Sequence, residues 1–267
     1  MKKKLLLLLA GIACLLLIAV LIGYKKKPES EPQPQALPPA VINQLPIKDR
    51  PYVTLIPRVD GKEVVLTING SAGADLVEYE LEYQAGNMIQ GAFGRIDFSQ
   101  DEPPVSKELL FGSCSKGKCK YDEDVSGGSL TLRFEGEQRF VLKGDFTLQL
   151  MAETEGIFTS RDGRLSLDLG SKDLASSTYV IVANTLGLPG TIEGEVVAGP
   201  YGFFTAAKSG KLAGAVLSWQ TSDDPAGLKI YGYVNGDWQE FSQNRSVEDK
   251  TISVSVDQLT TFVLVKE

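Results

Sequence analysis

Two cysteines and several carboxylates are the residues whose types and spacing could do chemistry. Cys114 and Cys119 flank the sequence Ser-Lys-Gly-Lys. The acidic runs are Asp97 with Asp101 and Glu102, then Asp122-Glu123-Asp124, and then Asp223-Asp224. The chain has no histidine, which is the most common proton shuttle at neutral pH and the most common transition-metal ligand. Ser-His-Asp catalysis, Cys-His catalysis and histidine-ligated zinc are therefore excluded.

The cysteine spacing predicts a disulfide at a hairpin tip. A hairpin with a four-residue loop would bring the Cα atoms of Cys114 and Cys119 near the ~5.5–6 Å that a disulfide needs. A reduced, inert pair is the alternative, and a catalytic dithiol would require two intervening residues and a helix start. A structural zinc site needs four ligands, more than two thiols can supply. Closing so short a loop stiffens the tip more than it stabilises the fold.

The acidic runs allow two further hypotheses. Hard cations such as Ca²⁺ bind six to eight oxygens, so Asp122, Glu123 and Asp124 are calcium candidates. Their spacing matches no defined calcium loop, and a solvated turn is the alternative reading. Two carboxylates facing each other across a cleft could also hydrolyse a glycoside, but the sequence places no pair in that way. We expect no cofactor and no catalytic site, with calcium left open.

An aromatic segment is the candidate contact surface. Gly199-Pro200-Tyr201-Gly202-Phe203-Phe204 reads as a loop flanked by glycines. If Tyr201, Phe203 and Phe204 were exposed in one plane, sugar rings could stack on them. Core packing is the alternative for most aromatic side chains in this half of the chain.

The elements that must position these residues begin with a membrane anchor. Residues 5–24 carry no charge and are flanked by lysines 2–4 and 25–27, and a helix of that length spans about 30 Å, the thickness of the hydrocarbon core. A cleaved signal peptide has a shorter apolar run and a small-residue cleavage site. We therefore expect an uncleaved, single-pass anchor over residues 1–27. Lipoprotein processing at Cys14 is the alternative.

Charge and compartment follow from the same segment. The six basic residues of the anchor leave 21 basic and 34 acidic residues from Pro28 onward, a balance that disfavours nucleic-acid binding. The lysine flanks are balanced, so the positive-inside rule does not orient the anchor. The acidic body and the close cysteine pair favour an oxidising compartment. We expect the N-terminus in the cytoplasm and the body outside the plasma (inner) membrane.

A proline-rich linker over residues 28–48 is expected to follow the anchor, because its six prolines favour the extended polyproline conformation. It reads either as a stalk that crosses the cell wall or as a plain flexible connection.

Beyond the linker the pattern is alternation with a period of two. In residues 77–83 valine, leucine and tyrosines share one face and glutamates share the other, which indicates an antiparallel strand on a core. Further strands are expected at residues 63–68, 129–134, 140–150, 178–183, 228–234, 251–256 and 262–265.

Turn signals separate these strands. Asp60-Gly61, Asp162-Gly163 and Asn235-Gly236 are typical of tight turns, whereas Gly127-Gly128 reads as a looser connection. The pattern predicts an all-β fold, and the 219 residues from 49 to 267 exceed the ~100 residues of one seven-stranded sandwich. We expect two antiparallel β-sandwich modules, residues 49–152 and 157–267, divided at 152–156.

Two stretches resemble known families. The Val-Glu-Tyr-Glu-Leu-Glu-Tyr strand and the strand number of the first module resemble fibronectin type III and immunoglobulin-like domains. The last strands, through Trp238-Gln239-Glu240-Phe241 to Leu259-Thr260-Thr261-Phe262, are similar to the sandwich shared by ankyrins, netrin receptors and bacterial surface proteins. That resemblance implies a scaffold only, because self-cleaving relatives have a histidine where Gln258 stands and glutamine cannot act as a general base. We expect Thr260 to be structural, its hydroxyl bonding backbone groups in the turn.

These observations predict a membrane-anchored, extracytoplasmic structural or adhesive protein of a bacterial envelope, without a catalytic site. The partner would be an envelope protein or a glycan. A carbohydrate-binding module is the alternative, and a glycosidase that uses carboxylates alone is a third.

Overall fold

The computed structural model describes residues 41–170, 174–208 and 211–267, which fall within the compact unit Ala40–Glu267. Within those three ranges, no helix is long and apolar enough to cross a membrane. The predicted anchor at residues 1–27, with its apolar stretch 5–24, and the linker residues 28–40 lie outside the described residues.

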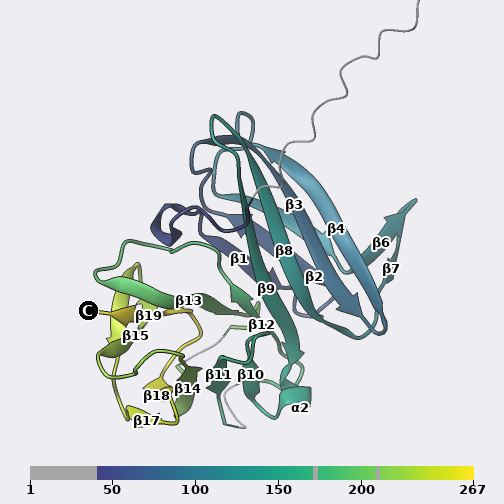
Figure 1. Cartoon of the computed structure of the whole chain (residues 1–267). Helices are drawn as coiled ribbons and strands as arrows, with labels where there is room; N and C mark the ends of the chain where they lie inside the picture. Colours follow the sequence, from purple (N-terminus) through teal and green to yellow (C-terminus); the bar gives the residue numbers. More distant parts are fainter. Residues whose placement is uncertain (1–40, 171–173, 209–210) are drawn as a thin grey trace, which may run out of the picture. The chain divides into compact units, whose positions relative to one another are not determined.

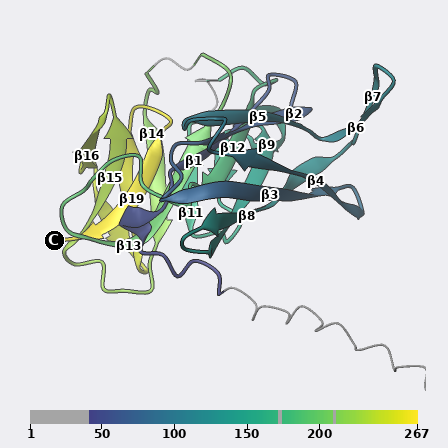
Figure 2. The same cartoon turned by 90° about the horizontal axis from the view of Figure 1, so that it is seen from above.

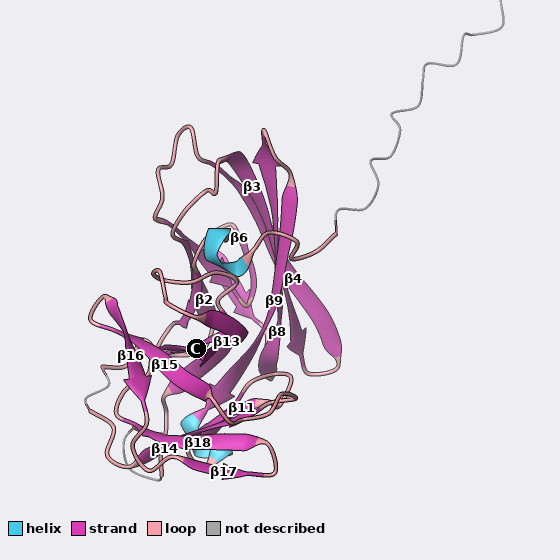
Figure 3. Cartoon of the chain, turned by 60° about the vertical axis from the view of Figure 1, so that its left-hand side comes forward, coloured by secondary structure: helices cyan, strands magenta, loops and turns pink. Residues whose placement is uncertain are grey.

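The described chain is all-β, as predicted, and its strands pair antiparallel (Figures 1 and 3). One sheet has nine strands in the order β16 (Asp237–Phe241), β15 (Leu228–Val234), β19 (Thr261–Lys266), β13 (Glu195–Phe204), β12 (Tyr179–Asn184), β9 (Phe140–Leu150), β8 (Val125–Gly136), β3 (Ala74–Ala85), β4 (Met88–Asp97). A second has the order β1 (Val53–Pro57), β2 (Glu63–Ile68), β5 (Val105–Leu110). A third has the order β10 (Ile157–Thr159), β11 (Leu165–Asp168), β14 (Ala215–Gln220), β18 (Thr251–Val256), β17 (Ser246–Glu248).

Smaller elements complete the fold. β6 (Gly112–Ser115) and β7 (Lys118–Tyr121) form a two-stranded hairpin that projects from the first half of the chain (Figures 1 and 2). The helical elements of the described residues are single turns, η1 (Ile47–Asp49) and α2 (Met151–Thr154).

The strands predicted from alternation are confirmed. Four of them match β2, β9, β15 and β18 at both ends. In β3, Val77, Leu81 and Tyr83 are buried, while the glutamates between them lie on the opposite face. One face of β3 therefore packs on a core and the other faces away from it, as the period of two requires.

The described residues form two hydrophobic cores. In the first, residues of β1, β2 and β5 pack against β3, β8 and β9, with Leu66 and Leu132 fully buried. In the second, β10, β11, β14 and β18 pack against β12, β13, β15 and β19, around Trp219 and Phe262.

Strand β12 belongs to both cores. Ile181 and Ala183 lie in the first core, and Val180 and Val182 lie in the second. A strand buried on both faces reads as a continuous apolar run, which is how Val-Ile-Val-Ala reads here. The described residues thus form two cores that share β12, within one compact unit.

Sheet pairing crosses the predicted division at residues 152–156. β9 and β12 pair over five positions, from Leu150 with Tyr179 to Phe146 with Ala183. The division itself falls on α2 and on the positive-φ residues Glu155 and Gly156, where the chain turns into β10.

The last residues of the predicted linker lie against this sheet. Asn43 accepts the backbone N–H of Lys143 at 2.9 Å and donates its own backbone N–H to Val141 at 2.8 Å. Residues 42 and 43 therefore run beside β9 and are not a free spacer.

The expectation of a loose connection at Gly127-Gly128 is wrong. Both glycines lie inside β8 and pair with β3. A Cβ atom on Gly128 would overlap the backbone of Glu82, so the glycine permits a close approach of two strands.

Candidate functional site

The predicted disulfide between Cys114 and Cys119 is confirmed. β6 and β7 pair so that the cysteines lie opposite each other, with Cα atoms 4.0 Å apart. β6 and β7 extend one pair beyond the cysteines, where Ser115 pairs with Lys118. The loop is therefore the two-residue turn Lys116-Gly117, with positive φ of 51° and 76°, as tight hairpin turns require.

Tyr83 attaches this hairpin to the first core. Its hydroxyl donates to Asp122 Oδ2 at 2.8 Å and accepts the backbone N–H of Gly112 at 2.9 Å. Its ring meets Phe111 edge-on, with centroids 4.8 Å apart. Burial and the hydrogen bond to Asp122 raise the pKa of Tyr83.

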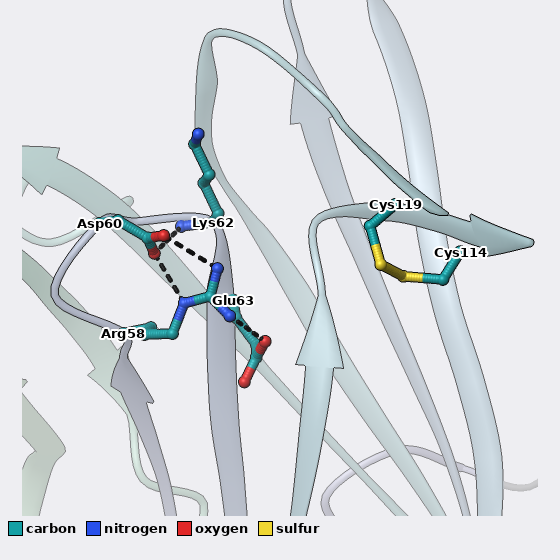
Figure 4. A network of polar contacts seen from close by, with 6 residues as sticks. All are labelled: Arg58, Asp60, Lys62, Glu63, Cys114 and Cys119. Carbon is teal, nitrogen blue, oxygen red and sulfur yellow. Dashed lines mark hydrogen bonds and ion pairs between the residues drawn. A yellow bond between two sulfur atoms is a disulfide. The ribbon is translucent and has the colours of Figure 1, made fainter. Parts of the chain in front are cut away.

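A charged cluster lies beside the hairpin (Figure 4). Arg58 donates to both oxygens of Asp60 at 2.8 and 2.9 Å and to Glu63 at 2.6 Å. The hydrogen bond from Arg58 lowers the pKa of Asp60. Lys62 Nζ lies 4.9 Å from the ring centroid of Tyr121. This cation–π contact links the β1–β2 turn to β7, and the network reads as structural.

The calcium candidates do not come together as a ligand set. Asp122 accepts from Tyr83, and the backbone carbonyl of Asp124 accepts the N–H of Gly86 at 3.2 Å. Across the described part of the chain, no group of three or more Asp, Glu or Cys side chains is placed to hold a metal ion. Nothing in the geometry of Asp122, Glu123 and Asp124 adds to the calcium hypothesis.

The predicted contact surface at Tyr201, Phe203 and Phe204 does not form. Phe203 is 2% exposed and lies in the second core, whereas Phe204 packs against the first. The two must point apart because they are neighbours in β13. Tyr201 is half-buried and donates its hydroxyl to Asp162 at 2.6 Å. The three rings therefore share no exposed plane, and the glycan hypothesis loses the surface on which it depended.

Two carboxylates that line one open cavity form ion pairs with lysines. A cavity of about 940 Å³ is lined in part by Glu240 and Asp257. Lys229 lies 3.1 Å from Glu240, and Lys211 lies 3.3 Å from Asp257. Both carboxylates are therefore engaged in ion pairs, and nothing in this geometry adds to the glycosidase hypothesis.

Thr260 has a structural role that differs from the expected one. Its hydroxyl donates to the backbone carbonyl of Tyr233, on β15, and not to a backbone group of its own turn. Leu259 packs against the second core. The hydroxyl therefore ties the start of β19 to the neighbouring strand.

β4 carries the most exposed aromatic side chain of the described residues. Phe93 is 85% exposed and Ile89 is 72% exposed. β4 ends the nine-stranded sheet, and among the described strands it pairs with β3 alone. Ile96 is buried in the first core, so every second residue from Ile89 to Arg95 points away from that core. We call Ile89, Gly91, Phe93 and Arg95 the β4 edge surface.

A row of glutamates borders the β4 edge surface. In the register of β3 and β4, Glu82 lies opposite Gly91, Glu80 opposite Phe93 and Glu78 opposite Arg95. On the other side of β3, Arg133 donates to Glu80 at 2.8 Å. The surface thus combines apolar side chains, one cation and an acidic border.

Sequence reasoning missed this strand. Residues 88–97 carry apolar side chains at both parities, with Ala92 and Ile96 on one face and Ile89 and Phe93 on the other. That pattern hides the alternation. The same pattern could have indicated an exposed apolar surface, because a strand with one solvated face would carry polar residues at positions 89 and 93.

Comparison of the chain with protein families, curated proteins and solved structures finds no match. The two resemblances seen in the sequence therefore stay predictions.

Proposed function

We propose that this protein is a membrane-anchored, extracytoplasmic structural or adhesive component that binds another polypeptide along the β4 edge surface. It acts by contact and not by catalysis. The observation that carries the proposal is the exposure of Ile89 and Phe93 on the terminal strand of a nine-stranded sheet.

A sheet edge is a template for a further strand. Its backbone N–H and C=O groups can pair with an added polypeptide, which gives affinity, while side-chain contacts give specificity. Soluble proteins commonly protect such edges with charges, prolines or short length. β4 has ten residues, and its central residues, Gly91 to Gly94, include no charge and no proline, so the edge is suited to pairing.

The compartment is argued from two features. An exposed disulfide such as Cys114–Cys119 persists in an oxidising environment. The apolar stretch 5–24 is long enough to anchor the chain. Together they support a single-pass protein of the plasma (inner) membrane with its body outside.

The experiment is site-specific photo-cross-linking of the full chain in the membranes of its own cells. A photoreactive phenylalanine analogue replaces Phe93, and in a matched control it replaces Gln239 on β16, at the opposite end of the sheet. We expect light-dependent protein adducts at position 93 and none at position 239. No adduct at 93, or equal adducts at both positions, would contradict the proposal.

A further inference from the structure

We propose that the polypeptide bound along the β4 edge surface is a second copy of this chain, whose β4 pairs antiparallel with the first around Phe93. This inference rests on the proposed function and names its partner. The pairing would join two nine-stranded sheets into one continuous sheet about a two-fold axis.

A two-fold axis through Phe93 sets the register. In an antiparallel pair related by a two-fold axis, the central residue faces itself and every other contact occurs twice. With Phe93 at the centre, Gly91 faces Arg95 of the second copy and Ile89 faces Asp97 of the second copy. Phe93 thus faces its own symmetry mate, and each Arg95 lies beside a glycine of the other copy.

Charge complementarity selects this register. Arg95 of the second copy would lie beside Gly91, and Glu82 lies directly beyond Gly91 on β3. Two strand spacings amount to about 10 Å, a gap that an arginine and a glutamate can close together. Gly91 has no side chain to block the contact. By symmetry, Arg95 of the first copy reaches Glu82 of the second.

The apolar residues fit the same arrangement. Phe93 would meet its symmetry mate as a cross-strand aromatic pair, which is among the more stabilising pairs in sheets. Burying a ring that is 85% exposed in the single chain adds a hydrophobic contribution at the centre of the interface.

Charge swapping tests the register. The full chain is purified in detergent, and dimerisation is measured by energy transfer between donor-labelled and acceptor-labelled copies. Arg95→Glu places each new glutamate beside Glu82 of the other copy, and Glu82→Arg places two arginines together. We expect each variant alone to dimerise about tenfold more weakly, because two attractive pairs become repulsive.

Mixing the two variants provides the decisive result. In a mixed dimer the glutamate introduced at position 95 meets the arginine introduced at position 82, and the retained Arg95 meets the retained Glu82. Both contacts therefore again join opposite charges. We expect the mixture to recover the affinity of the unmodified chain, and Gln239→Glu on β16 to leave it unchanged. Circular dichroism of each variant verifies that the fold is retained.

Two outcomes would overturn the inference. One is a mixture that dimerises no better than either variant alone. The other is an unmodified chain that stays monomeric while the cross-linker at position 93 captures a different protein, in which case the proposed function stands and this partner is wrong. Absence of any adduct at position 93 would remove the proposed function as well.

Discussion

The two ends of the nine-stranded sheet are built in opposite ways. β4 has ten residues and presents Ile89 and Phe93 away from the core. β16 has five residues, of which Asp237, Gln239 and Glu240 are exposed. Short length and charge are the means by which sheets avoid edge-to-edge pairing. The contrast indicates that one end is protected and the other is suited to contact.

The aromatic side chains at the two ends show the same contrast. Trp238 of β16 donates its indole N–H to the backbone carbonyl of Gly190 at 3.0 Å and meets Tyr233 edge-on at 5.3 Å. Phe93 of β4 is instead 85% exposed. An aromatic residue is therefore used for packing at one end and left available at the other.

The largest expected effect on stability is at Trp238. We expect Trp238→Ala to lower the free energy of unfolding by about 3 kcal/mol, because it removes a packed ring and its hydrogen bond. Phe93→Ala should change the unfolding of the monomer by less than about 0.5 kcal/mol. Denaturant unfolding of the purified chain at low concentration measures both. Equal losses of unfolding free energy in the two variants would contradict the contrast drawn between β16 and β4.

A smaller effect is expected at Gly94, on the inner face of β4. A Cβ atom there would overlap the phenol of Tyr79, so the strand needs a glycine beneath this ring. We expect Gly94→Val to cost about 2 kcal/mol through overpacking and to loosen β4 from β3. Gln90→Val in the same strand is the control. Gly86→Val at the hairpin turn is unsuitable because Gly86 has positive φ. If Gly94→Val were as stable as Gln90→Val, the packing described for this edge would be wrong.

The smallest effect is a pH dependence at the β16 end. Lys229 lies 2.6 Å from Glu267 and 3.1 Å from Glu240, and the hydrogen bond from Lys229 lowers the pKa of Glu267. A carboxylate with a lowered pKa in the folded state contributes stability above its unfolded pKa and loses it as the pH falls through the folded value. After correction for intrinsic exchange, we expect the amides of β15 and β16 to exchange faster at acidic pH than at neutral pH.

Glu267→Gln provides the control for this pH effect. It should reduce the pH dependence without altering the exchange of β4. A β16 end whose corrected exchange is the same at neutral and acidic pH would show that these ion pairs do not stabilise it.

Alternation predicted eight of the nineteen described strands, but it did not predict how the strands pair. The alternation of Val77 to Tyr83 marks β3 because one face is apolar and the other acidic. The pairing of β9 with β12 has no local signal, since it joins residues that are 29 (Leu150 and Tyr179) to 37 (Phe146 and Ala183) positions apart. A continuous sheet whose strands β12 and β13 face both cores therefore could not be predicted from the sequence.

Two predictions, the loose connection at Gly127-Gly128 and the aromatic loop at residues 199–204, were wrong for physical reasons. Gly127-Gly128 reads as a turn, yet here glycine permits close approach of two strands. The glycines around Tyr201 suggested a loop, but the segment continues β13. Once it is a strand, Phe203 and Phe204 must face opposite sides, and both sides are cores. The disulfide was predictable because a hairpin across this short spacing brings the two cysteines together.

Hydrogen–deuterium exchange of the full chain compares the two ends most directly. We expect the amides of residues 88–97 to become more protected as the chain concentration rises, and Phe93→Lys to abolish that change. The amides of β16 should exchange at one rate throughout. If β4 exchanged independently of concentration in the unmodified chain, or if Phe93→Lys protected it equally, the β4 edge surface would not be the contact between copies.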